Sequence, residues 1–199
     1  MRSDAGTFIR SAATAAIMLL VGGFLLRGEG YAAERRISAP PEYQVKAAFV
    51  YNFIRFVEWP LRGQGGSAAE DTVRLCVLGD PPDKAAFAAL DGQEIAGKRL
   101  FLAFLQEPGE IRDCQVLFLP STVSNKLPEV LEVLQGQPVL TIGDTEGYAG
   151  RGVMINLYLD NKRVRFEINA ETSGAAGLRI SAKLLNLAGK LYGVSRPGK

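Results

Sequence analysis

The chain has 199 residues, of which 47% are hydrophobic, and its 23 basic and 21 acidic side chains leave a net charge of +2. This profile is typical of a globular protein, and it lacks the concentrated basic surface of a nucleic-acid-binding protein. Because the sequence contains no histidine, Ser-His-Asp triads, Cys-His pairs and histidine-ligated metal sites are excluded. We therefore expect a protein that is not an enzyme and that needs no nucleic acid, cofactor or metal.

The N-terminal residues predict an export signal. Arginines flank the beginning of the uncharged, mostly apolar run 11–26, and small residues before position 33 fit cleavage after Ala32. An uncleaved anchor is the alternative, but this run is shorter than the roughly 20 residues that cross a bilayer. We expect residues 1–32 to be a signal peptide and residues 33–199 to form a single exported domain.

An unusually apolar helix is predicted over residues 43–57. Its apolar side chains follow helical spacing, and Phe49, Phe53 and Phe56 add a second stripe beside the first. In the body of this element, from Val45 to Trp59, only Lys46, Asn52, Arg55 and Glu58 are polar. With so narrow a polar face, the helix is expected to be buried on most sides, either in its own core or beneath a partner subunit. Pro60 ends it and fixes Trp59 at the exit.

Residues 72–144 alternate between apolar runs and short helical patterns. Strands are predicted at 72–80, 98–105, 114–120 and 138–144, and helices at 82–92 and 127–134. This alternation is typical of an α/β fold with a mainly parallel sheet flanked by helices.

The C-terminal part has a different pattern. Residues 153–169 predict two strands joined at Asp160-Asn161-Lys162, which would add an antiparallel hairpin to the sheet. Residues 178–193 predict an amphipathic helix.

Two cysteines, Cys76 and Cys114, lie in the part expected to be exported. An even number of cysteines in an oxidising compartment favours a disulfide bond. A bridge between these positions, 38 apart in the sequence, would stabilise the fold by about 4 kcal/mol through loop entropy. Two separate buried thiols are the alternative, because each cysteine adjoins an apolar run.

Two carboxylates and a glycine-rich segment are candidate ligand sites. Asp80 and Asp144 each follow a predicted buried strand, where α/β proteins place ligand-handling residues. A turn-forming Gly-Asp pair explains both positions equally well. The segment 147–152, GYAGRG, has its glycines in the wrong order for a phosphate loop.

The second hairpin strand, RVRFEIN, alternates between polar and apolar side chains. Arg163, Arg165 and Glu167 share one face, and Phe166 points to the other with its apolar neighbours. The polar face is either an ordinary solvated surface or a surface that selects a protein partner by its charge.

Six segments in order resemble the YfiR family of periplasmic proteins, and the resemblance covers about residues 41–192. The segments are YQVKAAFVYNFIRFVEWP, LCVLGD, DCQVLFLP, PVLTIGD, MINLYLDNKRVRFEIN and LRISAKLLNLA.

The resemblance implies a periplasmic repressor that binds the periplasmic domain of an inner-membrane diguanylate cyclase and thereby controls cyclic di-GMP and biofilm formation. It also implies a homodimer, a disulfide between Cys76 and Cys114, and a partner-binding face on the hairpin. The candidate partner-binding residues are Asn156, Arg163, Arg165, Phe166 and Glu167. A periplasmic small-ligand-binding module, with a cleft near Asp80 and Asp144, is the alternative function.

Overall fold

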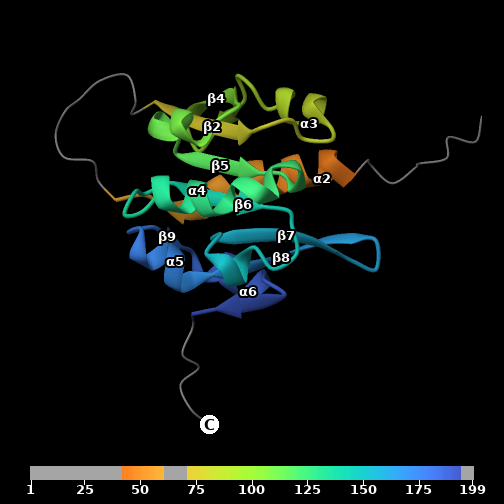
Figure 1. Cartoon of the computed structure of the whole chain (residues 1–199), viewed down its shortest axis with the longest axis vertical. Coiled ribbons are helices and arrows are strands. Elements are labelled where there is room, and N and C mark those ends of the chain that lie inside the picture. Colours follow the sequence, from red (N-terminus) through yellow and green to blue (C-terminus); the bar gives the residue numbers. More distant parts are fainter. Residues whose placement is uncertain (1–41, 61–70, 194–199) are drawn as a thin grey trace, which may run out of the picture. The chain divides into compact units, whose positions relative to one another are not determined.

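The computed structural model describes residues 42–60 and 71–193 (Figure 1). Its helices are α2 (Glu42–Ile54), α3 (Lys84–Ala88), η1 (Pro108–Asp113), η2 (Ser121–Lys126), α4 (Leu127–Val133), η3 (Ala149–Arg151), α5 (Ala170–Ala175) and α6 (Ala182–Leu187). Its strands are β1 (Val57–Glu58), β2 (Thr72–Leu78), β3 (Glu94–Ile95), β4 (Lys98–Leu105), β5 (Val116–Leu119), β6 (Leu140–Gly143), β7 (Ile155–Asp160), β8 (Arg163–Asn169), β9 (Arg179–Ile180) and β10 (Lys190–Tyr192). The predicted signal peptide, residues 1–32, lies outside the described residues.

Eight strands form one sheet in the order β10-β8-β7-β6-β5-β2-β4-β3. The strands from β4 through β2, β5 and β6 to β7 pair in parallel, whereas β7 pairs with β8 and β3 with β4 in antiparallel fashion. The predicted α/β class, with a mainly parallel sheet, flanking helices and an antiparallel hairpin near the C-terminus, is therefore confirmed.

The two faces of the sheet bury separate hydrophobic clusters. In β2, Leu75 and Val77 belong to one cluster, and Cys76 and Leu78 belong to the other, because successive side chains of a strand point to opposite faces. The first cluster includes residues of α2, α3 and α6, and the second includes residues of η1 and α4. Both faces are therefore covered, as the near-continuous apolar runs predict.

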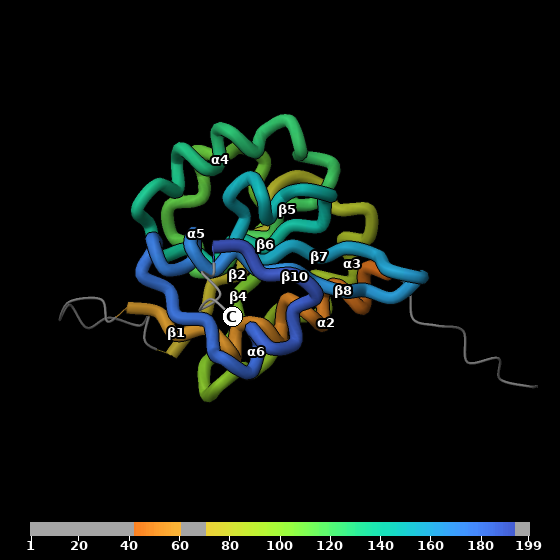
Figure 2. The backbone as a smooth tube through the Cα atoms, turned by 90° about the horizontal axis from the view of Figure 1, so that it is seen from below, coloured from red at the N-terminus to blue at the C-terminus, as the bar shows by residue number. Residues whose placement is uncertain are grey.

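The hairpin between β7 and β8 turns at Asn161 and Lys162. Both residues have positive φ angles, of 48° and 63°. Two consecutive left-handed residues are typical of a type I′ turn, whose twist matches that of the flanking strands. The tip of the hairpin projects beyond the neighbouring elements (Figure 2).

The first helix is shorter than predicted. It ends at Ile54, and Val57 and Glu58 instead form β1, which pairs in antiparallel fashion with Ile180 and Arg179 of β9. The carbonyl of Phe56 also accepts a hydrogen bond from the amide of Ser181, at 2.8 Å. Pairing with a segment far along the chain therefore ends the helix before Pro60.

The single helix predicted over residues 178–193 is wrong. The Ser181 hydroxyl accepts a hydrogen bond from the Leu184 amide and caps the six-residue helix α6. Ala188 is extended, and the following residues form β10, which pairs in parallel with residues 167–169 of β8. Strand pairing with the free edge of β8 is therefore favoured over the helix that the apolar spacing of residues 188–193 predicts.

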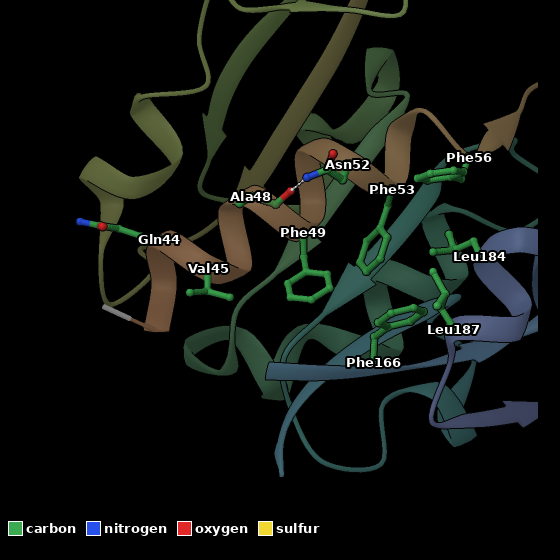
Figure 3. Close-up of a pocket in the computed structure, with 10 residues that line it drawn as sticks. All are labelled: Gln44, Val45, Ala48, Phe49, Asn52, Phe53, Phe56, Phe166, Leu184 and Leu187. Atoms are coloured by element: carbon green, nitrogen blue, oxygen red, sulfur yellow. Dashed lines mark hydrogen bonds between the residues drawn. The ribbon is translucent and has the colours of Figure 1, made fainter. Parts of the chain in front are cut away.

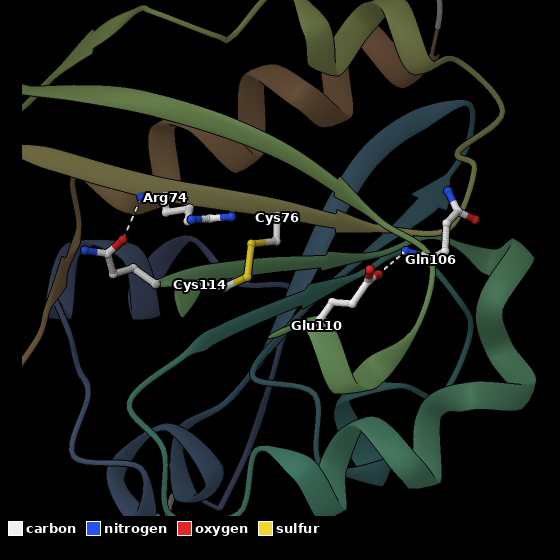
Figure 4. The surroundings of a disulfide bond; sticks show 6 residues. Arg74, Cys76, Gln106, Glu110 and Cys114 are labelled. Atoms are coloured by element: carbon white, nitrogen blue, oxygen red, sulfur yellow. Dashed lines mark hydrogen bonds between the residues drawn. A yellow bond between two sulfur atoms is a disulfide. The ribbon is translucent and has the colours of Figure 1, made fainter. Parts of the chain in front are cut away.

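A disulfide bond joins Cys76 of β2 to Cys114, two residues before β5, the strand next to β2 in the sheet (Figure 4). The two Cα atoms are 5.9 Å apart, within the usual range for a disulfide. Both residues are buried in the second cluster. The bond therefore links two neighbouring strands inside the core.

We predict that replacing both cysteines by alanine lowers the free energy of unfolding by about 2–5 kcal/mol, because the unfolded chain gains freedom. Urea denaturation of the variant and of oxidised and reduced wild-type protein measures this loss. Two free thiols in native, exported protein would contradict the assignment.

Candidate functional site

The structure separates the predicted partner-binding residues into two groups. Arg163 and Arg165 are exposed near the tip of the hairpin, and Arg165 is 3.9 Å from Asp160, at the limit of an ion pair. Phe166 is buried in the first cluster, beneath α2. The exposed positive charge of this strand therefore lies on its first half.

Asn156 and Glu167 are buried, with exposed fractions of 0% and 8%. The Glu167 carboxylate accepts hydrogen bonds from the Asn156 amide at 3.0 Å and from the Tyr192 hydroxyl at 3.1 Å. The expectation that Glu167 shares a solvated face with the two arginines is wrong, because β10 pairs beside it. In the isolated chain, these two residues form an internal hydrogen-bond network, and their role toward a partner stays a prediction.

A buried ion pair connects the first helix to the sheet. The Lys46 ammonium group is 2.9 Å from the Asp144 carboxylate, and the Tyr43 hydroxyl donates to the same oxygen at 2.7 Å. Lys46 was expected on the polar face of the helix but is only 5% exposed. Its ammonium group also lies 2.5 Å from Glu42.

The Tyr43 hydroxyl remains protonated in this cluster. Burial raises the pKa of Tyr43, and the hydrogen bond to the Asp144 carboxylate raises it further, because ionisation would place two negative charges side by side. Tyr43 is therefore a hydrogen-bond donor at every physiological pH.

The structure does not bring Asp80 and Asp144 into one cleft. Asp80 is exposed, and its carboxylate lies 3.7 Å from the Lys84 ammonium group. The strands that precede them, β2 and β6, are separated by β5. The Asp144 carboxylate is instead paired with the Lys46 ammonium group. The prediction of a ligand cleft near both aspartates therefore has no geometric support.

An apolar groove of about 470 Å³ runs along the outer side of α2 (Figure 3). Phe166 of β8 and Leu184 and Leu187 of α6 face the helix across this groove. The helix contributes Gln44, Val45, Ala48, Phe49, Asn52 and Phe53, and the turn after it contributes Phe56. The groove is therefore built from three elements that are far apart in the sequence.

The sequence indicated only one wall of the groove. The stripe of Phe49, Phe53 and Phe56 was visible from its helical spacing. The opposite wall was not, because it needs α6 to end at Leu187 so that the chain can return as β10.

The segment 147–152 does not form a phosphate-binding loop before a helix. It includes the short helix η3, and the Arg151 guanidinium lies 5.8 Å from the centre of the Tyr148 ring. Within the part of the chain that the structure describes, no group of three or more acidic or cysteine side chains could hold a metal ion. Nor is any helix among residues 42–60 and 71–193 long and apolar enough to cross a membrane.

The profile of the YfiR/HmsC-like family matches residues 43–189, from the first turn of α2 to the residue before β10. The chain belongs to the YfiR/HmsC-like family. The match includes both cysteines, the Lys46–Asp144 pair and all the candidate partner-binding residues, whereas Glu42 and β10 lie just outside it.

Two solved structures are similar at 12% sequence identity and a TM-score of 0.45. One is an ABC domain of Streptococcus pneumoniae in complex with L-Trp, with 60% of this chain and 55% of that chain covered. The other is a conserved domain protein of Vibrio cholerae, with 75% and 60% covered. The chain thus spans less than two thirds of either protein.

We predict that Lys46→Met lowers the free energy of unfolding by about 3–5 kcal/mol, because it leaves a buried carboxylate without its cation. Asp144→Asn should cost less, since Glu42 still pairs with Lys46. The double variant should be more stable than the sum of the two losses predicts, as measured by urea denaturation in a double-mutant cycle. Simple additivity would contradict the coupling.

We also predict that Glu167→Ala destabilises the fold by about 1–3 kcal/mol, because the buried Asn156 amide loses its acceptor. Arg165→Ala on the same strand is the matched control and should change stability by less than about 0.5 kcal/mol. Thermal or urea unfolding distinguishes them, and equal effects would refute the internal role of Glu167.

Proposed function

We propose that this protein is a periplasmic regulator that binds and represses an inner-membrane diguanylate cyclase, and so controls cyclic di-GMP and biofilm formation. The observation that carries this proposal is the YfiR/HmsC-like match, which spans nearly the whole described body. The regulator acts by binding the periplasmic domain of the cyclase and performs no bond chemistry of its own.

Export follows from the N-terminal sequence. Residues 1–32 act as a signal peptide cleaved after Ala32, and residues 33–199 act as the single mature domain, which forms a homodimer. The disulfide supports this location, because such bonds persist in oxidising compartments such as the periplasm.

The partner contact includes the exposed part of the hairpin. Arg163 and Arg165 offer positive charge there, and charge of this kind at the edge of an interface steers association and selects partners. Beside them, Phe166, Asn156 and Glu167 contribute mainly by holding the strand in shape, through the first cluster and the hydrogen bonds to Glu167.

We predict that deletion of the gene raises intracellular cyclic di-GMP, and that a chain with Arg163→Glu and Arg165→Glu restores repression less well than the wild type. Reversal of two interfacial charges introduces repulsion where attraction is expected. Mass-spectrometric quantification of cyclic di-GMP in the complemented strains measures both effects.

A matched control reverses two exposed charges on β4, Lys98→Glu and Arg99→Glu, at the opposite end of the sheet from the hairpin. This variant should repress normally. Unchanged cyclic di-GMP on deletion would refute the proposed function. Full repression by the hairpin variant, with a clear effect of deletion, would refute only the contact surface.

A further inference from the structure

The groove beside α2 has the length and spacing of a helix-binding site. Val45, Phe49 and Phe53 lie along it at intervals of four residues, so they form one ridge of α2. From Val45 to Phe53 the helical rise corresponds to roughly 12 Å, or about two turns, and Phe56 follows in the turn after the helix. An amphipathic helix places its apolar residues on such a groove with the same periodicity.

Part of the groove is exposed apolar surface. Leu187, on the wall formed by α6, is 63% exposed, the largest value among the large hydrophobic residues of the described chain. Exposed apolar surface that lines a groove typically marks a site of interaction. No other described segment covers the groove.

A lysine side chain lies at one end of the groove. None of its ten lining residues is charged. The Lys183 ammonium group lies 5.7 Å from the centre of the Phe56 ring, at one end of the groove. Among the described residues, no carboxylate lies within ion-pairing distance of Lys183, so an acidic residue of an occupant would complement it.

This charge pattern disfavours a second copy of the chain as the occupant. In a symmetric dimer the same patch meets itself, so both partners contribute identical residues. Because none of the ten lining residues is acidic, a contact of groove with groove would bring no carboxylate from the lining to Lys183.

We propose that this groove binds an amphipathic helix of the regulated membrane protein. The helix inserts apolar side chains along Phe49, Phe53 and Leu187, and it places an aspartate or glutamate near Lys183. This assignment rests on the proposed function as a regulator of a membrane protein, and it adds a second contact to that of the hairpin.

Site-specific photocrosslinking in intact cells tests the proposal. A photoreactive phenylalanine analogue replaces Ala48, which is exposed on the ridge of α2 and lines the groove. The matched control carries the analogue at Phe101, which is 51% exposed on β4. We expect position 48, and not position 101, to crosslink to an apolar helical segment of a membrane protein, identified by mass spectrometry of the joined peptides.

Two further substitutions in the chain with the analogue at position 48 test the chemistry. Leu187→Glu should lower the crosslinking yield about tenfold or more, which is the usual effect of losing an apolar anchor. Lys183→Glu should lower it by a smaller factor that shrinks at high salt. Phe101→Glu should leave it unchanged, and the thermal unfolding of all three variants checks that they fold.

The outcomes separate this proposal from the proposed function. A crosslink at position 48 to a second copy or to lipid, no crosslink, or a yield unaffected by Leu187→Glu would overturn the groove proposal. If deletion nevertheless raises cyclic di-GMP, the proposed function survives. A crosslink to a helix of a protein that is not a cyclase, without any change of cyclic di-GMP on deletion, supports the groove and overturns the function.

Discussion

The structure depends on how α2 is fixed against the parallel sheet. Ala47, Val50 and Phe53 bury one side of the helix in the core, and the Lys46–Asp144 ion pair adds a contact that is satisfied in one orientation only. A buried charge without a partner is costly, so rotation of the helix about its axis is strongly opposed. This fixed orientation turns Phe49 toward the groove, where Phe166 lies 6.0 Å away between ring centres.

Most of the fold could be predicted from the sequence because its strands carry strong local signals. The runs around Leu75, Leu117 and Leu140 are apolar on both faces, which is the pattern of a covered parallel sheet, and the turn at Asn161 marks the hairpin. The ends of α2 and α6 could not be predicted, since strand pairing between distant segments decides them. The helical spacing of apolar residues reflects only a local preference, and it carries no information about strands elsewhere in the chain that can pair with the segment.

The candidate site was less predictable, because polar residues do not reveal whether they are buried. Lys46 and Glu167 look like surface residues in the sequence, yet each is enclosed by groups supplied from elsewhere, Asp144 for the first and Tyr192 for the second. The cysteines were easier, since their even number in a chain expected to be exported already favoured a bond. One wall of the groove could be predicted from the phenylalanine stripe. The other wall could not, because the sequence pattern did not indicate that α6 ends at Leu187.

The central claim is that this chain regulates by binding another protein outside the cytoplasm. The most direct measurement is the rate of cyclic di-GMP synthesis by the membrane cyclase, reconstituted in lipid vesicles with its periplasmic domain facing outward, as purified mature protein is added. The account predicts a saturable fall in this rate, since binding outside must inhibit the catalytic domain inside. A rate that stays constant at saturating protein, with the protein bound to the vesicles, would contradict it.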